Sequence, residues 1–221
     1  MLSDEEIKFI KTFKHNTKKE EKIHIIQMKH VFNFIDSGKM KILDLACGSG
    51  EYSHILLKRG YDVTSVDIKK LCNGLNFTKC SADNLPFKEH TFDMVICTEA
   101  IEHFDNPFNV LGEIKRVLKT NGILIMTTPN LMSLRFFFKR YIFKGNYDRE
   151  HLYGEYSSFN MVRILQTREF SIEKYETFEI IPGVNILDKL LSKIPVIRDM
   201  GSYTIVYCKN KLENKSKWWF K

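Results

Sequence analysis

The sequence predicts an α/β domain built around a mostly parallel sheet, and three observations carry that prediction. Between about residues 40 and 130, short apolar runs alternate with segments of helical spacing. The runs are continuously apolar, which is typical of strands covered on both faces. A glycine-rich turn, ACGSG at 46–50, follows the first run directly, where ligands bind in such folds. The chain has 221 residues, of which 43% are hydrophobic, enough for one domain with an added lid.

The elements follow in order along the chain. Segment 20–38 has apolar residues at helical spacing and ends at Gly38, so it predicts a helix. Further helices are predicted over 51–60, 106–122 and 157–170. Strands are predicted over 40–46, 61–67, 77–82, 92–98, 123–128, 171–180 and 201–210. We therefore expect an N-terminal helical segment at 1–38, a main domain at 39–208 with a lid-like insert at about 131–155, and a tail at 209–221.

Bulk properties narrow the class of protein. The five cysteines are scattered and form no Cys-x-x-Cys pair, so we expect free core thiols in a reducing compartment. No run approaches the roughly 18 apolar residues of a membrane-spanning helix, and the charged start lacks the core of a secretory signal. A cytoplasmic location is expected. The net charge of +7 suits an anionic partner, but a lysine-rich surface is the favoured explanation.

The glycine turn carries the first functional signal. Gly48 and Gly50 let the backbone approach a ligand, and the helix that follows offers free N–H groups to an anion. A nicotinamide or flavin site would have a third glycine at position 53, where this chain has Ser53. Asp44 lies two residues before the turn, and its carboxylate favours a ligand that carries a cation over a pyrophosphate.

Two further acids extend this pattern. Asp67 closes the second predicted strand, where a carboxylate can accept hydrogen bonds from two ribose hydroxyls. Asp83 follows the third strand and can meet the exocyclic amine of adenine. S-adenosylmethionine combines a cationic amino acid, a ribose and an adenine. It is the cofactor that these positions predict.

These segments resemble a known family. ILDLACGSG, VTSVD, SADNLPF, FDMVICTEAIEHF and EIKRVLKTNGILIMTTPN are similar, in order, to the motifs of class I S-adenosylmethionine-dependent methyltransferases. They most resemble the subgroup that includes the ubiquinone-biosynthesis O-methyltransferases and the type 11 and type 23 methyltransferase domains. The resemblance covers about Met40 to Asn130. It implies a Rossmann-like seven-stranded sheet of order 3-2-1-4-5-7-6, with the last strand antiparallel and helices on both faces.

The resemblance also implies the cofactor contacts. The N-terminal segment is expected to cover the cofactor site, with S-adenosylhomocysteine as the product. Two features depart from the family pattern: Ala46 replaces a usual glycine, and the segment between Asp67 and Asp83 is short. The expected cofactor residues are Asp44, Ala46, Cys47, Gly48, Ser49, Gly50, Asp67, Ile68, Ala82, Asp83, Asn84 and Thr98.

The group TEAIEHF supplies the candidates for catalysis. His103 is the candidate general base, with Glu99 beside it, although His103 can equally serve only to pack against the cofactor or to cap a helix. By resemblance to metal-dependent O-methyltransferases, Glu99, Glu102, His103 and His151 are candidate ligands of Mg²⁺. Cys97 is expected to be a core residue. The segment lacks the Asn/Asp-Pro-Pro-Tyr of enzymes that methylate planar nitrogens, so a hydroxyl acceptor is favoured.

The acceptor itself stays open. The insert LRFFFKRYIFKG, Leu134 to Gly145, mixes aromatic and basic residues, which suits a lid packed on the sheet or an anionic lipid surface. We expect a small-molecule, lipid or glycan acceptor, with peripheral membrane contact through this insert as one interpretation. Nucleic acid is the less favoured partner, and the sequence does not predict an oligomeric state. Two other functions remain: a cofactor-binding partner or sensor without catalysis, and an RNA 2′-O-methyltransferase.

Overall fold

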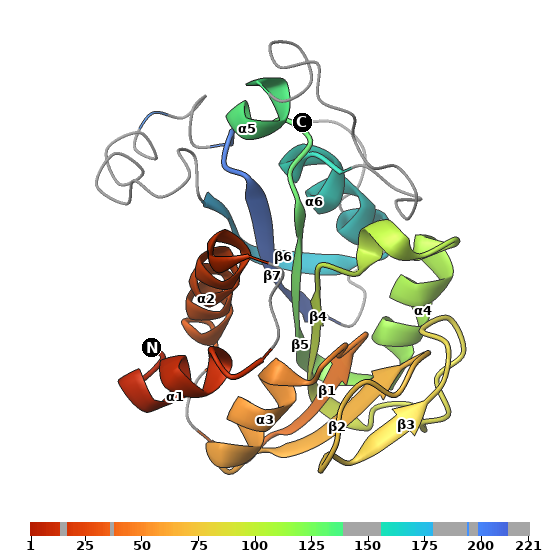
Figure 1. Cartoon of the computed structure of the whole chain (residues 1–221). Coiled ribbons are helices and arrows are strands. Elements are labelled where there is room, and N and C mark those ends of the chain that lie inside the picture. The colour runs from red at the N-terminus through yellow and green to blue at the C-terminus, as the bar shows by residue number, and fades with distance from the viewer. Residues whose placement is uncertain (14–16, 36–37, 139–155, 179–193, 195–198, 212–221) are drawn as a thin grey trace.

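The computed structural model describes residues 1–13, 17–35, 38–138, 156–178, 194 and 199–211 (Figure 1). Most of the predicted lid-like insert and of the tail, His151 included, lies outside these ranges. The helices are α1 Asp4–Ile10, α2 Lys18–Phe32, α3 Glu51–Lys58, η1 Ile101–His103, α4 Pro107–Val117, α5 Leu134–Phe137 and α6 Ser158–Thr167. The strands are β1 Lys41–Leu45, β2 Asp62–Asp67, β3 Phe77–Lys79, β4 Phe92–Thr98, β5 Leu118–Pro129, β6 Phe170–Phe178 and β7 Tyr203–Asn210.

The strands form one seven-stranded sheet of order β3-β2-β1-β4-β5-β7-β6. The first five strands are parallel to one another, and β7 runs antiparallel to both β5 and β6. The order reverses between β1 and β4, which places a topological switch point at their carboxyl ends. The predicted fold class, strand order and antiparallel last strand are confirmed.

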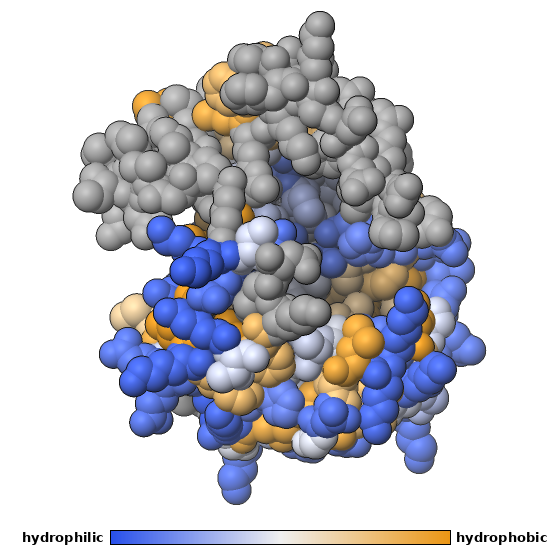
Figure 2. All heavy atoms as spheres, in the orientation of Figure 1, coloured by the Kyte–Doolittle hydropathy of each residue, from blue (hydrophilic) through white to orange (hydrophobic). Residues whose placement is uncertain are grey.

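Helices cover both faces of this sheet, with α1, α2 and α3 on one face and α4 and α6 on the other (Figure 1). Side chains alternate between the faces along each strand, so Ile42 belongs to the core under α2 and α3, whereas Leu43 belongs to the core under α4. Hydrophilic residues cover the outer side of α1 and α2 (Figure 2). This double covering explains why the central strands read as continuously apolar.

Two local features differ from the sequence prediction, and a third agrees with it. Within the N-terminal segment predicted to be helical, α1 was not predicted as a separate helix; its start has a capping box in which Ser3 and Glu6 bond to each other's backbone N–H groups. Helix α4 ends at Val117, not at Gly122, because Leu118 already pairs with Phe92 at the start of β5. No helix forms between β2 and β3, as the short sequence there suggested. In the described ranges, every helix is too short or too polar to cross a bilayer.

Candidate active site

A cavity of about 390 Å³ opens beyond the carboxyl ends of β1, β2 and β4. Its wall includes seven of the predicted site residues: Ala46, Asp67, Ile68, Ala82, Asp83, Glu99 and His103. Parallel strands end at one edge of the sheet, so Ala46 and His103 both line this cavity although they are 57 positions apart in sequence (103 − 46). The other predicted cofactor residues, Asp44, Cys47, Gly48, Ser49, Gly50, Asn84 and Thr98, do not contribute to its wall.

The glycine turn between β1 and α3 has a left-handed backbone. Ala46, Gly48 and Gly50 have φ values of 58°, 53° and 80°. At Gly50 an added Cβ would lie 2.4 Å from Leu75 Cδ1 and 3.0 Å from Cys72 Cβ, so the segment after β2 packs directly on the turn. Ala46 takes the same left-handed conformation with a side chain, which is strained for a residue other than glycine.

Asp67 connects this turn to the end of β2. Its Oδ2 accepts a hydrogen bond of 3.0 Å from the Gly48 N–H, and its Oδ1 accepts one of 3.0 Å from the Lys69 N–H. Two backbone donors thereby fix the direction of a half-buried carboxylate in the cavity wall. Asp83 also lies in the wall but is exposed.

Asp44, a predicted cofactor residue at the end of β1, is buried beside the glycine turn. It is 2% exposed and accepts a 2.6 Å hydrogen bond at Oδ2 from Ser53 Oγ. Ser53 Oγ lies 2.7 Å from Ser65 Oγ, so the acid is part of a buried polar chain. Burial raises the pKa of Asp44 to about 6, and the hydrogen bond from Ser53 partly opposes that rise.

Glu99 follows β4 with a left-handed backbone, φ 48°, and its N–H bonds to the carbonyl and the hydroxyl of Thr127. Its carboxylate is bonded to Thr127 and to Gln27 of α2, while its Oε1 is buried without a hydrogen-bond partner among the described residues. Burial, and then the nearby Glu102, raise the pKa of Glu99 well above its usual range. A strained acid with a free oxygen in a cavity wall is typical of a functional residue.

Glu102 is 3% exposed and accepts a 3.1 Å hydrogen bond from Thr128 Oγ1; burial raises its pKa, and His103 opposes that rise. Thr127 and Thr128 are adjacent in β5, so they point to opposite faces of the sheet. Glu99 therefore reaches toward α2, and Glu102 toward the face of α4 and α6.

This divergence bears on the predicted metal site. The described part of the chain contains no group of three His, Cys, Asp or Glu side chains placed to hold a metal ion. The hydrogen-bond partners of the Glu99 and Glu102 carboxylates lie on opposite faces of the sheet, and His103 is exposed. The fourth predicted ligand, His151, lies outside the described residues. The structure gives no support to the magnesium site.

Sequence reasoning missed several residues of the site. Phe104, Asp105, Asn106 and Val110 line the cavity beside η1 and the first turn of α4. The Asn106–Pro107 helix start was a usable signal, since it places the first turn of a helix directly after the candidate base. Gln27, by contrast, reaches Glu99 from 72 positions away, and no local pattern indicates that. Cys97 is fully buried and burial raises the pKa of its thiol, as expected for a core residue.

Comparisons with known proteins agree with this geometry. Residues 43–126 match the family model described as "Methyltransferase domain". The ubiquinone biosynthesis O-methyltransferase of Rickettsia prowazekii is 29% identical over 184 residues, 75% of this chain and 66% of that protein. A ubiquinone/menaquinone biosynthesis C-methyltransferase of Desulfotalea psychrophila is 30% identical over 124 residues, 49% of this chain and 50% of that protein. The chain thus spans between half and two thirds of these two relatives.

The fold is also found in solved structures. An S-adenosylmethionine-dependent methyltransferase from Archaeoglobus fulgidus superposes with a TM-score of 0.63 at 20% identity, covering 85% of this chain and 93% of that one. At this identity the likeness establishes the fold alone. Sheet order, switch-point cavity and the match over residues 43–126 agree: this chain is similar to the class I S-adenosylmethionine-dependent methyltransferases.

Proposed function

We propose that the protein transfers a methyl group from S-adenosylmethionine to a hydroxyl of a small molecule, lipid or glycan. The observation that carries this proposal is the cavity at the switch point between β1 and β4, with Asp67 fixed in its wall. Apolar Ile68, Ala82 and Val110 offer flat contacts for an adenine ring, and Asp67 offers acceptors for ribose hydroxyls. The residues present therefore fit the adenosine half of the cofactor.

The cofactor, when bound, would supply a methyl group already activated by its sulfonium. The chain then has to orient the acceptor and receive its proton; orientation alone can contribute roughly 7–11 kcal/mol. His103 and Glu99 both lie in the cavity wall, so both are placed to take a proton from an acceptor hydroxyl. A raised pKa makes the Glu99 carboxylate a stronger base than an exposed one.

The choice of a hydroxyl rests on the sequence after β4 and on the O-methyltransferase relative. The C-methyltransferase relative shows that the same domain type serves other acceptor atoms. Binding without catalysis, or methylation of RNA at the 2′-oxygen, would use the same cofactor cavity. The acceptor experiment below separates these possibilities.

Two measurements test the proposal. Calorimetry with S-adenosylhomocysteine should give a dissociation constant in the micromolar range, roughly −8 kcal/mol. Tritiated methyl transfer from labelled cofactor into fractionated host extract should then place label in a lipid, glycan or small-molecule pool. Label in RNA would favour the 2′-oxygen alternative, and cofactor binding without any transfer would favour the sensor alternative. No heat of binding would refute the proposal.

The described first part of the predicted insert, residues 131–138, favours contact with a lipid surface as part of this function. Met132, Phe137 and Phe138 are 59%, 49% and 44% exposed, and hydrophobic side chains show at the surface of α5 in Figure 2. Vesicle flotation checks this: wild type should float with anionic vesicles, and Phe137→Ser with Phe138→Ser should float less. Flotation that is equal for both proteins, or absent for wild type, would argue for a lid without membrane contact.

A further inference from the structure

The loop that follows β3 forms one wall of the cavity and contains no helix or strand of its own. Cys80, Ser81, Ala82 and Asp83 line the cavity, and regular structure resumes only at Phe92 in β4. A loop without regular structure places its side chains loosely unless its backbone is bonded to another element. The contacts that hold the backbone of this loop therefore determine how precisely its side chains are placed in the cavity wall.

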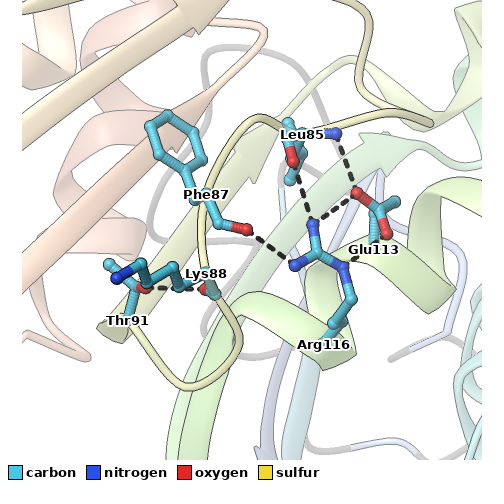
Figure 3. Close-up of polar contacts among 6 residues, drawn as sticks. All are labelled: Leu85, Phe87, Lys88, Thr91, Glu113 and Arg116. Atoms are coloured by element: carbon cyan, nitrogen blue, oxygen red, sulfur yellow. Dashed lines mark hydrogen bonds and ion pairs between the residues drawn. The ribbon is translucent and has the colours of Figure 1, made fainter.

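Helix α4 holds that backbone through two side chains (Figure 3). Glu113 Oε2 accepts a 2.8 Å hydrogen bond from the Leu85 N–H, and Arg116 Nη2 donates one of 2.9 Å to the Leu85 carbonyl. Arg116 Nη1 donates a 2.7 Å hydrogen bond to the Phe87 carbonyl. Both polar groups of Leu85 are thus satisfied by one helix, only two residues beyond Asp83.

The two side chains also fix each other. Arg116 Nε and Nη2 each lie 2.7 Å from a carboxylate oxygen of Glu113, in a forked ion pair. The hydrogen bond to Arg116 lowers the pKa of Glu113, and the same bond raises the pKa of Arg116. Because a planar guanidinium can serve a carboxylate and two carbonyls together, lysine cannot replace this arrangement.

The opposite end of α4 forms a second part of the same cavity. Asn106, the N-cap of the helix, and Val110 in its second turn both line the wall. One rigid helix therefore connects the wall near Val110 with the wall near Asp83. Displacing the loop from α4 would widen the cavity between these two sides.

We propose that Glu113 and Arg116 are positioning residues for the adenosine half of the cofactor, acting through the loop at 80–87. This inference rests on the proposed cofactor site. Neither side chain belongs to the cavity wall, so their effect is indirect: they set the distance between Asp83 and the first turns of α4. The amino-acid half of the cofactor does not depend on them.

Two ligands distinguish binding of the adenosine half of the cofactor from binding of its amino-acid half. S-adenosylhomocysteine has both halves, whereas 5′-methylthioadenosine keeps the adenosine half and lacks the amino acid. Arg116→Gln should weaken both ligands by the same factor, about tenfold, the effect of losing charged hydrogen bonds on the loop. Arg116→Lys should recover only part of that loss. Glu113→Gln, which keeps the size of the side chain, should also weaken both ligands.

A matched control is available at Arg59. Its guanidinium bonds to Glu6 at 2.7 and 3.0 Å and to the Met1 carbonyl at 3.0 Å, so it too ties a segment to a helix with a forked ion pair. Arg59→Gln should lower the thermal unfolding midpoint comparably but change both affinities less than about twofold. Unfolding curves for each variant ensure that binding is measured on folded protein, and Glu113→Gln serves if Arg116→Gln does not fold.

The outcomes are distinct. Equal affinity of wild type and folded Arg116 or Glu113 variants would overturn the inference, as would a loss confined to S-adenosylhomocysteine. Equal weakening by Arg59→Gln would also overturn it, since the effect would then be general destabilisation. If wild type binds neither ligand, the proposed cofactor site fails, and that result is separate from the role of α4.

Discussion

Ser53 Oγ donates a 2.6 Å hydrogen bond to Asp44 Oδ2 in the buried interior between β1 and α3. The pair holds a carboxyl group directly behind the glycine turn, where water cannot solvate its charge. Burial raises the pKa of Asp44 to about 6, so ionisation of this group costs free energy near neutral pH when no cation is bound. Such an acid is suited to a ligand that brings positive charge.

Replacing Asp44 by Asn should therefore change the pH dependence of stability. The pKa of Asp44 is raised in the folded protein from a usual value of 3.8. The contribution of the protonated Asp44 carboxyl group to the free energy of unfolding is complete below about pH 4. It is lost as the pH rises through about 6. Relative to wild type, Asp44→Asn should gain stability over this range, by at most about 3 kcal/mol. Urea unfolding of both proteins at several pH values measures the difference.

All other groups are shared by the two proteins, so their titration cancels in that difference. Parallel stability curves would contradict the raised pKa of Asp44. Ser53→Ala is a useful companion variant, because it removes the hydrogen bond and leaves the acid. It should increase the loss of stability that wild type shows as the pH rises. Asp44→Asn should also bind S-adenosylhomocysteine more weakly if the carboxylate favours the amino group of the ligand.

The glycine turn makes a second prediction, about stability. Gly50→Ala would place a Cβ 2.4 Å from Leu75 Cδ1 at a φ of 80°, so it should cost about 1–3 kcal/mol. Gly112→Ala is the matched control. It lies in α4 with nothing within 4 Å of the added Cβ and without a positive φ, and it should be neutral or stabilising by about 1 kcal/mol. Thermal or urea unfolding compares them, and equal effects would contradict the close packing of Leu75 on the turn.

The turn that contains Gly50 is one of the parts of the molecule that can be predicted from sequence. The turn at 46–50 and the first five strands have local signals: short apolar runs, small residues at fixed spacing and an acid at the end of β2. The strand order came from resemblance to a family, not from the pattern itself. The predicted end of α4 was wrong because pairing of Leu118 with Phe92 outweighs the helical spacing that continues past Val117.

Contacts between residues far apart in the sequence could not be predicted. Gln27 bonds to Glu99, and Arg116 to the Leu85 carbonyl, through tertiary packing that no short pattern encodes. Asp44 has a local signal, but its hydrogen bond with Ser53 depends on the packing of α3 on β1. Sequence therefore predicted the cavity wall better than the layer behind it.

Asp67 gives a third prediction, about cofactor affinity. Its carboxylate is held by the Gly48 and Lys69 N–H groups, with the remaining acceptor capacity facing the cavity. Asp67→Ala should weaken S-adenosylhomocysteine at least about tenfold in calorimetry. Asp62, at the other end of β2 and exposed, is the matched control, and Asp62→Ala should leave the affinity unchanged. Equal affinity of Asp67→Ala and wild type would remove Asp67 from the cofactor site.

The last prediction distinguishes the two candidate bases. His103 is exposed at the cavity wall, whereas Glu99 is strained, buried at Oε1 and bonded to Gln27. If His103 takes the proton, His103→Ala should lower labelled methyl transfer at least about a hundredfold while S-adenosylhomocysteine affinity stays within about twofold of wild type. Full turnover by His103→Ala together with loss of turnover by Glu99→Gln would assign the base to Glu99. Because Gln27 and Thr127 bond to the Glu99 carboxylate, Gln27→Leu should then shift the pH profile of transfer, whereas it should leave that profile unchanged if His103 is the base.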